Sequence, residues 1–145
     1  MRLVNFEFGS KVSRLGVLVN DPADNDLPDN DLSNSDRVLD LAELASAAGD
    51  AASWFSGMAE FLAAGDEARV AAQKLVRRPD SGSAGHALAE VRLLAQVPRP
   101  GKIIAVGLNY RDHAIETKME IPTSPVIFAK FTTSVTGPDA PVVLP

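Results

Sequence analysis

Apolar and polar residues alternate at the start of the chain. Residues 3–8 read Leu-Val-Asn-Phe-Glu-Phe, and this period of two predicts a half-buried strand. Gly9-Ser10 interrupts the pattern, and residues 15–19 predict the second strand of a hairpin. Strand character returns at residues 38–41, and the alanine-rich run after them predicts a helix that stops near residue 49. The chain therefore begins with β structure and then turns helical.

The middle of the chain carries a helical pattern. A longer helix is predicted to start near Asp50 or Ser53, and a second helical segment follows Gly65. Apolar residues of the longer helix recur at helical spacing, which indicates a face turned to the core rather than a cofactor site. That stripe consists of Trp54, Phe55, Met58, Phe61 and Leu62, and the second segment carries Val70, Ala71 and Leu75.

A polar turn follows the apolar run at residues 103–107, which predicts a short strand buried on both faces. Gly107 permits close approach to the backbone, and Asn109 is expected to cap a short helix that runs to about Thr117. Residues 117–125 contain two prolines and predict a loop that crosses a cleft.

These elements indicate an α+β protein with two parts. Residues 98–101 read Pro-Arg-Pro-Gly and are the predicted boundary. Residues 1–97 are expected to form a small N-terminal β/α domain with an acidic loop at residues 20–36 and a linker at residues 77–86. Residues 98–145 are expected to begin a second domain.

Composition narrows the possible partners and location. The chain has 145 residues, 46% of them hydrophobic, which is enough for a packed core. With 14 basic and 19 acidic residues the net charge is -5, so nucleic acid is not an expected partner. No apolar run approaches the length of a membrane span or of a signal-peptide core, so a cytoplasmic protein without a membrane partner is expected. There is no cysteine, which excludes a thiolate nucleophile and Cys-ligated zinc.

Two features outside the polar turn suggest metal binding at first sight. The Asp- and Asn-rich loop lacks the central glycine and final glutamate of an EF-hand, so a solvated loop is the favoured interpretation. His86 is distant in sequence from other potential ligands, and a lone surface histidine is the favoured interpretation there. No metal ligand is therefore assigned in this chain.

His113 and Glu116 are the candidate catalytic residues. Their spacing of three places an imidazole and a carboxylate on one face of the short helix. A carboxylate that accepts a hydrogen bond from one ring nitrogen fixes the tautomer, so that the other nitrogen handles a proton of water or substrate. Serine chemistry is rejected, because no serine lies in a Gly-x-Ser-x-Gly elbow.

Three motifs in order give the chain a family resemblance. They are the run Pro-Gly-Lys-Ile-Ile-Ala-Val-Gly-Leu-Asn-Tyr-Arg-Asp-His-Ala-Ile-Glu from Pro100, the predicted strand Pro-Val-Ile-Phe-Ala-Lys from Pro125, and Gly-Pro-Asp-Ala-Pro from Gly137. The chain resembles the fumarylacetoacetate hydrolase family of metal-dependent enzymes, which act on 2,4-diketo acids and related 2-oxo acids. The resemblance implies that the second part is the incomplete start of that family's mainly-β catalytic fold, and that residues 1–97 match the small N-terminal domain more loosely.

The resemblance implies roles for particular residues. His113 and Glu116 match a dyad that activates water or moves protons, on a helix that can order when substrate binds. Lys130, at the polar end of its strand, matches a lysine near the cleft and is a candidate substrate contact; a solvated lysine is the alternative. Arg111 is a second candidate for a substrate carboxylate, with an exposed helix position as its alternative. Asn109 and Tyr110, like Gly107, are expected to hold the turn.

The resemblance also implies a divalent cation, Mg²⁺ or Mn²⁺, held by two glutamates and an aspartate that follow the last motif. We expect this chain to be truncated before them, to bind no cation and to be inactive alone. The complete enzyme is expected to be a homodimer that hydrolyses, decarboxylates or isomerises a 2-oxo or diketo acid substrate. The alternative from the same residues is a non-catalytic remnant or a dimerisation module.

Overall fold

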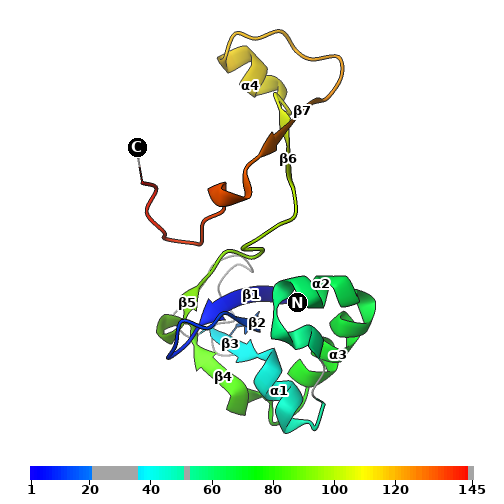
Figure 1. Ribbon diagram of the computed structural model, residues 1–145, viewed down its shortest axis with the longest axis vertical. Coiled ribbons are helices and arrows are strands. Elements are labelled where there is room, and N and C mark those ends of the chain that lie inside the picture. Colours follow the sequence, from blue (N-terminus) through cyan, green and yellow to red (C-terminus); the bar gives the residue numbers. More distant parts are fainter. Residues whose placement is uncertain (21–35, 51–52, 144–145) are drawn as a thin grey trace. The chain divides into compact units, whose positions relative to one another are not determined.

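A computed structural model describes residues 1–20, 36–50 and 53–143 (Figure 1). The predicted acidic loop lies outside the described residues except at its two ends. The described chain forms two compact units. The first unit contains residues 1–98 and 136–145, and the second contains residues 99–135.

The first unit is a five-stranded antiparallel sheet with three helices on one side (Figure 1). The strand order is β4-β3-β2-β1-β5. The predicted first hairpin and the strand-to-helix step after it are confirmed. The strands are β1 Arg2–Glu7, β2 Arg14–Val19, β3 Arg37–Asp40, β4 Gly85–Ala87 and β5 Arg92–Leu93; the helices are α1 Leu41–Ala47, α2 Met58–Ala64 and α3 Asp66–Val76; 3₁₀ turns occupy Ser53–Ser56, Ser81–Ala84 and Leu88–Glu90.

Both faces of the sheet are covered. Leu15, Val17 and Leu39 pack with the helices on one face. The other face carries a second core made of Val4, Phe6, Leu18 and Val38, which packs against residues 88–93. The prediction of a half-buried first strand is therefore wrong, because Val4, Asn5 and Phe6 are all buried.

A short segment joins the two edges of this sheet. In a flat sheet β4 and β5 would lie four strand spacings, about 19 Å, apart. Only residues 88–91 connect them, and three of these form a 3₁₀ turn, so the connection reaches about 13 Å. The sheet must therefore curl around its second core. Consistent with this, the ring of Phe6 on β1 lies 5.9 Å from that of His86 on β4.

The predicted longer helix is interrupted. Gly57 has extended backbone and separates the Ser53–Ser56 turn from α2, so one continuous helix from residue 50 or 53 is wrong. Phe55, Met58 and Phe61 are buried as predicted, whereas Leu62 is 56% exposed. The second helical segment is confirmed as α3, with Leu75 in the core but Val70 exposed.

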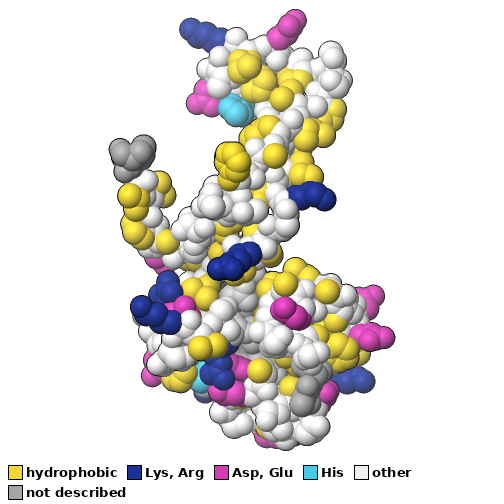
Figure 2. Space-filling view, viewed as in Figure 1, with side chains coloured by type: hydrophobic (Ala, Val, Ile, Leu, Met, Phe, Trp, Pro, Cys, Tyr) yellow, Lys and Arg dark blue, Asp and Glu magenta, His cyan; other side chains and the backbone are white. Residues whose placement is uncertain are grey.

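The second unit is an antiparallel ribbon interrupted by a helix. It consists of β6 Ile103–Gly107, α4 Arg111–Glu116, β7 Val126–Lys130 and a 3₁₀ turn at Thr132–Ser134. Ile104, Val106 and Ile127 share one face of the ribbon and are 66%, 47% and 66% exposed. The prediction that β6 is buried on both faces is therefore wrong for the described chain. Figure 2 shows hydrophobic side chains along this ribbon.

None of the helices in the described parts of the chain is long and apolar enough to cross a membrane.

Candidate functional site

The polar turn after β6 begins with unusual backbone. Leu108 has φ of 49°, a left-handed conformation that costs energy for any residue with a side chain. It lies between the end of β6 and the start of α4. Tyr110, not Asn109, is the N-cap residue of α4, and it makes no capping bond through its side chain. The expectation that Asn109 caps the helix is thus wrong, because the helix begins one residue later.

The helix α4 carries both candidate catalytic residues on neighbouring turns. His113 and Glu116 are exposed, and only Ala114 of this helix is buried. Thr117 is the C-cap residue of the helix, and its Oγ1 donates a 2.7 Å hydrogen bond to the carbonyl oxygen of His113. Across the described residues, no hydrogen bond or ion pair joins His113 to Glu116. Both side chains are thus available to a ligand, and their mutual contact stays a prediction.

A groove lies beside this turn within the second unit. Its volume is about 370 Å³. The predicted site residues Gly107, Asn109 and Arg111 line it, whereas His113 and Glu116 do not. The other wall is the loop at residues 121–125, which includes two prolines. The loop prediction is confirmed, and Arg111 is the charged side chain that faces this groove.

Lys130 lies at the opposite end of the ribbon. It pairs with Ile103, while Gly107, from which the chain leads to α4, pairs with Val126. The two ends are four residue-to-residue steps apart along the strand, a distance of about 13 Å. The Nζ atom of Lys130 sits 5.9 Å from the ring centre of Phe128. The structure therefore does not bring Lys130 to the turn that carries His113.

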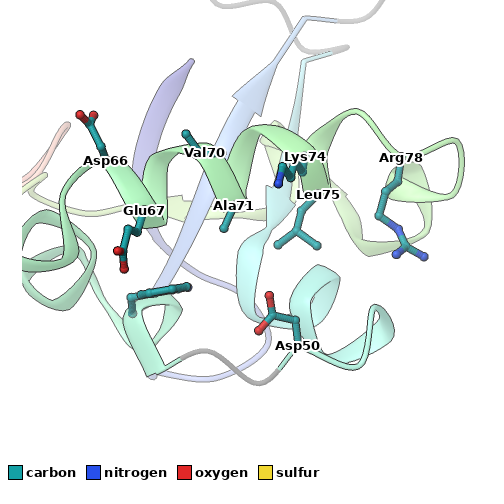
Figure 3. A pocket seen from close by; sticks show the side chains of 9 residues that line it. Asp50, Asp66, Glu67, Val70, Ala71, Lys74, Leu75 and Arg78 are labelled. Carbon is teal, nitrogen blue, oxygen red and sulfur yellow. The ribbon is translucent and has the colours of Figure 1, made fainter.

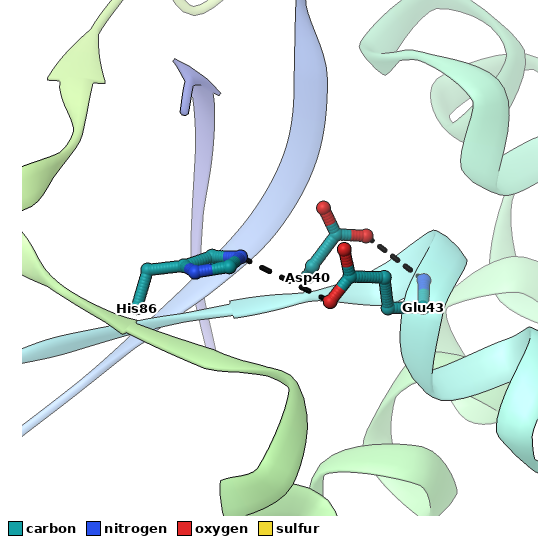
Figure 4. A group of neighbouring side chains, drawn as sticks. All are labelled: Asp40, Glu43 and His86. Atoms are coloured by element: carbon teal, nitrogen blue, oxygen red, sulfur yellow. Dashed lines mark hydrogen bonds and ion pairs between the residues drawn. The ribbon is translucent and has the colours of Figure 1, made fainter. Parts of the chain in front are cut away.

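A cluster that sequence reasoning missed lies in the first unit (Figure 4). Ligand atoms of Asp40, Glu43 and His86 all lie within 4.8 Å of one another. His86 is not a surface residue: 14% of its side chain is exposed, and its ring stacks on Phe8 with 3.9 Å between ring centres. The prediction of a lone surface histidine is wrong, because β4 pairs with β3 and delivers His86 beside the carboxylates.

Arg14 forms ion pairs with both carboxylates of this cluster. Its Nε lies 2.8 Å from Oδ2 of Asp40, and its Nη2 lies 2.8 Å from Oε1 of Glu43. Oδ1 of Asp40 accepts a 2.9 Å hydrogen bond from the backbone N–H of Glu43 and so caps α1. Burial raises the pKa of Asp40, and these bonds partly oppose the shift. The group is a stabilising ion-pair network, in which a cation would compete with the guanidinium.

Only the spacing of Asp40 and Glu43, typical of a helix cap, was visible in the sequence. Arg14 and His86 come from distant strands, and no local pattern connects them.

The comparisons with known proteins converge on one family. Residues 102–145 match the model of the fumarylacetoacetate (FAA) hydrolase C-terminal domain, and they contain every residue of the predicted site. Residues 102–145 are thus a segment of the fumarylacetoacetate hydrolase family, and the relatives below support the same family.

Two curated relatives match parts of the chain of different length. Oxaloacetate tautomerase fahd2 of Xenopus laevis is 38% identical over 88 residues, which is 61% of this chain and 27% of that protein. The 2,4-didehydro-3-deoxy-L-rhamnonate hydrolase of Sphingomonas is 58% identical over 45 residues, 31% of this chain and 16% of that enzyme. The chain thus spans less than a third of these fumarylacetoacetate hydrolase family relatives.

A solved structure covers the whole chain. The crystal structure of a protein designated HpcE from Mycobacterium smegmatis matches with a TM-score of 0.60 and 26% identity, over 100% of this chain and 41% of that protein. The mixed helix and strand content agrees with the predicted α+β class.

Proposed function

We propose that this chain carries the proton-handling part of an active site that acts on 2,4-diketo or 2-oxo acids. The observation that supports it is the placement of His113 and Glu116 three positions apart on α4, shortly after the strained residue Leu108 and within the segment that matches the family. Strained backbone beside exposed side chains that can exchange protons is typical of functional sites.

The relatives' printed names describe compatible chemistry. A tautomerase moves a proton between a carbon atom and the oxygen of the neighbouring carbonyl group, and oxaloacetate is a 2-oxo acid. A hydrolase of a didehydro sugar acid must activate water. Both tasks need a base that exchanges protons near neutral pH, and imidazole is suited to this. In our proposal His113 is that base, and Glu116 orients its ring. General acid–base catalysis of this kind contributes about 10²- to 10⁴-fold.

The groove suggests how a substrate carboxylate is held. Arg111 lines the groove and lies two residues before His113 on α4. A guanidinium can bind a carboxylate through two parallel hydrogen bonds. We therefore propose Arg111 as the carboxylate contact of the turn. Lys130 remains a candidate contact for a more distant anionic group, since it lies at the other end of the ribbon.

The family implies Mg²⁺ or Mn²⁺, which would supply Lewis-acid stabilisation of an enolate. The residues around α4 do not fit such a cation. Throughout the described residues, the one group of three acidic or histidine side chains that converges is Asp40, Glu43 and His86, and Arg14 occupies it. We propose that the cation ligands lie outside the site on α4 and its groove.

The test uses the product of the complete open reading frame that encodes this chain. Enol–keto conversion of oxaloacetate and hydrolysis of an acylpyruvate are followed by ultraviolet absorbance, with Mg²⁺ or with EDTA. His113→Ala is expected to lower kcat by about 10²-fold or more. Glu116→Gln is expected to have a smaller effect, and Asp112→Asn on the same helix is the control. Wild-type turnover by the His113→Ala variant would contradict the proposal.

A second candidate function is a non-catalytic interaction module. It is favoured by the first unit, which has two cores of its own and needs nothing from the ribbon to bury them. The same assays distinguish the two functions. Absence of turnover with both substrates in the presence of Mg²⁺ would favour the module.

A further inference from the structure

Helix α3 presents a groove on the surface of the first unit, far in sequence from the proposed site. Its inner side buries Ala68, Ala72 and Leu75. Its other side, with Trp54 and Asp50, lines a groove of about 690 Å³ (Figure 3).

Some of the charged side chains that line this groove form ion pairs within the chain, and others do not. Asp66 bonds to Arg69 at 2.9 Å, and Arg78 bonds to Asp80 at 2.8 Å. Glu67 and Lys74 also line the groove and are exposed, but neither makes a hydrogen bond or an ion pair with any described residue. They lie seven positions apart, two turns of helix, and so share one face of α3.

Between these two charges the helix surface is apolar and small. Val70 is 41% exposed, and Ala71 is partly buried beside it. A small residue at the centre lets another helix approach within about 8–10 Å. The negative and the positive charge lie at equal distances from an apolar centre. When a second copy of the helix runs in the opposite direction, each charge therefore faces the opposite charge of the other copy.

We propose that α3 pairs antiparallel with α3 of a second copy of this chain. A two-fold axis midway between residues 70 and 71 places Val70 against Ala71 of the second copy. The same axis places Glu67 opposite Lys74 of the second copy, and Lys74 opposite its Glu67. The pairing is isologous, so each contact occurs twice. It satisfies the two charges that the chain itself leaves unpaired.

The proposed contact between the two α3 helices is small, so a weak association is expected. One helix of 11 residues and its groove bury less than the roughly 1,200 Å² of a standard stable interface. Dissociation constants of about 10 µM to 1 mM are expected for such a contact. Because two ion pairs contribute, added salt is expected to weaken the association further.

The test is a charge swap measured by sedimentation equilibrium of the full 145-residue chain, in low and high salt. Glu67→Lys and Lys74→Glu each replace two attractions with two repulsions, so each is expected to weaken self-association at least tenfold. The double variant restores complementarity and is expected to dimerise like the wild type. An equimolar mixture of the two single variants is expected to form a heterodimer.

Two further variants serve as matched controls. Lys11→Glu and Glu90→Lys make the same charge changes at exposed positions away from α3, and they are expected to leave association unchanged. Circular dichroism is expected to show unchanged folding for all variants. A chain that stays monomeric at millimolar concentration would overturn the proposal. So would association that no α3 variant alters, which would point to the exposed ribbon instead.

Discussion

Removing the charge of Arg14 tests whether the network at the start of α1 supports the fold. The substitution Arg14→Met keeps most of the aliphatic stem but removes the guanidinium. Asp40 is completely buried, so it would lose the cation that lies 2.8 Å from its carboxylate. Removing one partner of a buried ion pair costs about 3–5 kcal/mol. Since Arg14 is 28% exposed, we expect the lower end, about 3 kcal/mol.

The expected loss is large enough for a thermal melt. In a unit of about 100 residues each kcal/mol shifts Tm by roughly 4–8 °C, so Tm is expected to fall by about 12–24 °C. Urea denaturation gives the free energy of unfolding directly. A change below about 0.5 kcal/mol, the range of ordinary surface substitutions, would refute the argument.

The pH dependence gives a second readout with a definite sign. Burial raises the pKa of Asp40 in the folded chain, so its ionisation costs folding free energy. That cost is absent below the unfolded-state pKa and develops as the pH rises through the folded-state pKa. Without Arg14 the folded-state pKa is expected to rise further. The variant should therefore recover stability relative to the wild type as the pH falls from neutral toward the ordinary pKa range of a carboxyl group.

A double variant checks the cause. Adding Asp40→Asn removes the buried charge but retains a side-chain oxygen to accept the hydrogen bond from the N–H of Glu43. This variant should regain part of the lost stability and lose the pH dependence. If the double variant is as pH-dependent as Arg14→Met alone, a group other than Asp40 is responsible.

Three further outcomes are expected. Gly16→Ala would place a Cβ 2.6 Å from Val38 and 2.9 Å from Phe6, so it should cost about 1–3 kcal/mol in urea denaturation; no loss would mean that this core can shift. Leu108→Gly relieves the positive φ and should not lower Tm, whereas Leu108→Val should lower it. Millimolar Mg²⁺ should leave Tm of this chain unchanged, because Arg14 occupies the one convergent cluster of the described residues; a rise of several degrees would reveal a site.

Local patterns predicted the elements well. These patterns depend only on residues that are neighbours in sequence. The alternation in residues 3–8 and the apolar run before Gly107 each predicted a strand correctly, and Gly9 marked the end of the first strand. Exposure was predicted less well. Ile104 on β6 is exposed, whereas Asn5 on β1 is buried. Burial depends on which elements distant in sequence pack against each strand, and a local pattern does not contain that information.

The site divides in the same way. The spacing of His113 and Glu116 follows from one helix and was predictable, whereas the separation of Lys130 from them depends on strand register, which the sequence did not specify. The burial of His86 depends on the pairing of β4 with β3, 46 residues after Asp40. Asn109 was predicted to cap α4, but the N-cap residue is Tyr110. Helix boundaries are uncertain by one or two residues when they are predicted from sequence.

The number of residues in the segment 88–91 limits how far apart the two edge strands of the first unit, β4 and β5, can lie. Because this segment spans the two borders of the sheet, inserting even a few residues there would let the borders move apart and enlarge the space around Phe6 and Val38. Deleting one would compress the same space. Among related chains, the number of residues between β4 and β5 should therefore vary together with the bulk of the side chains at positions 6 and 38.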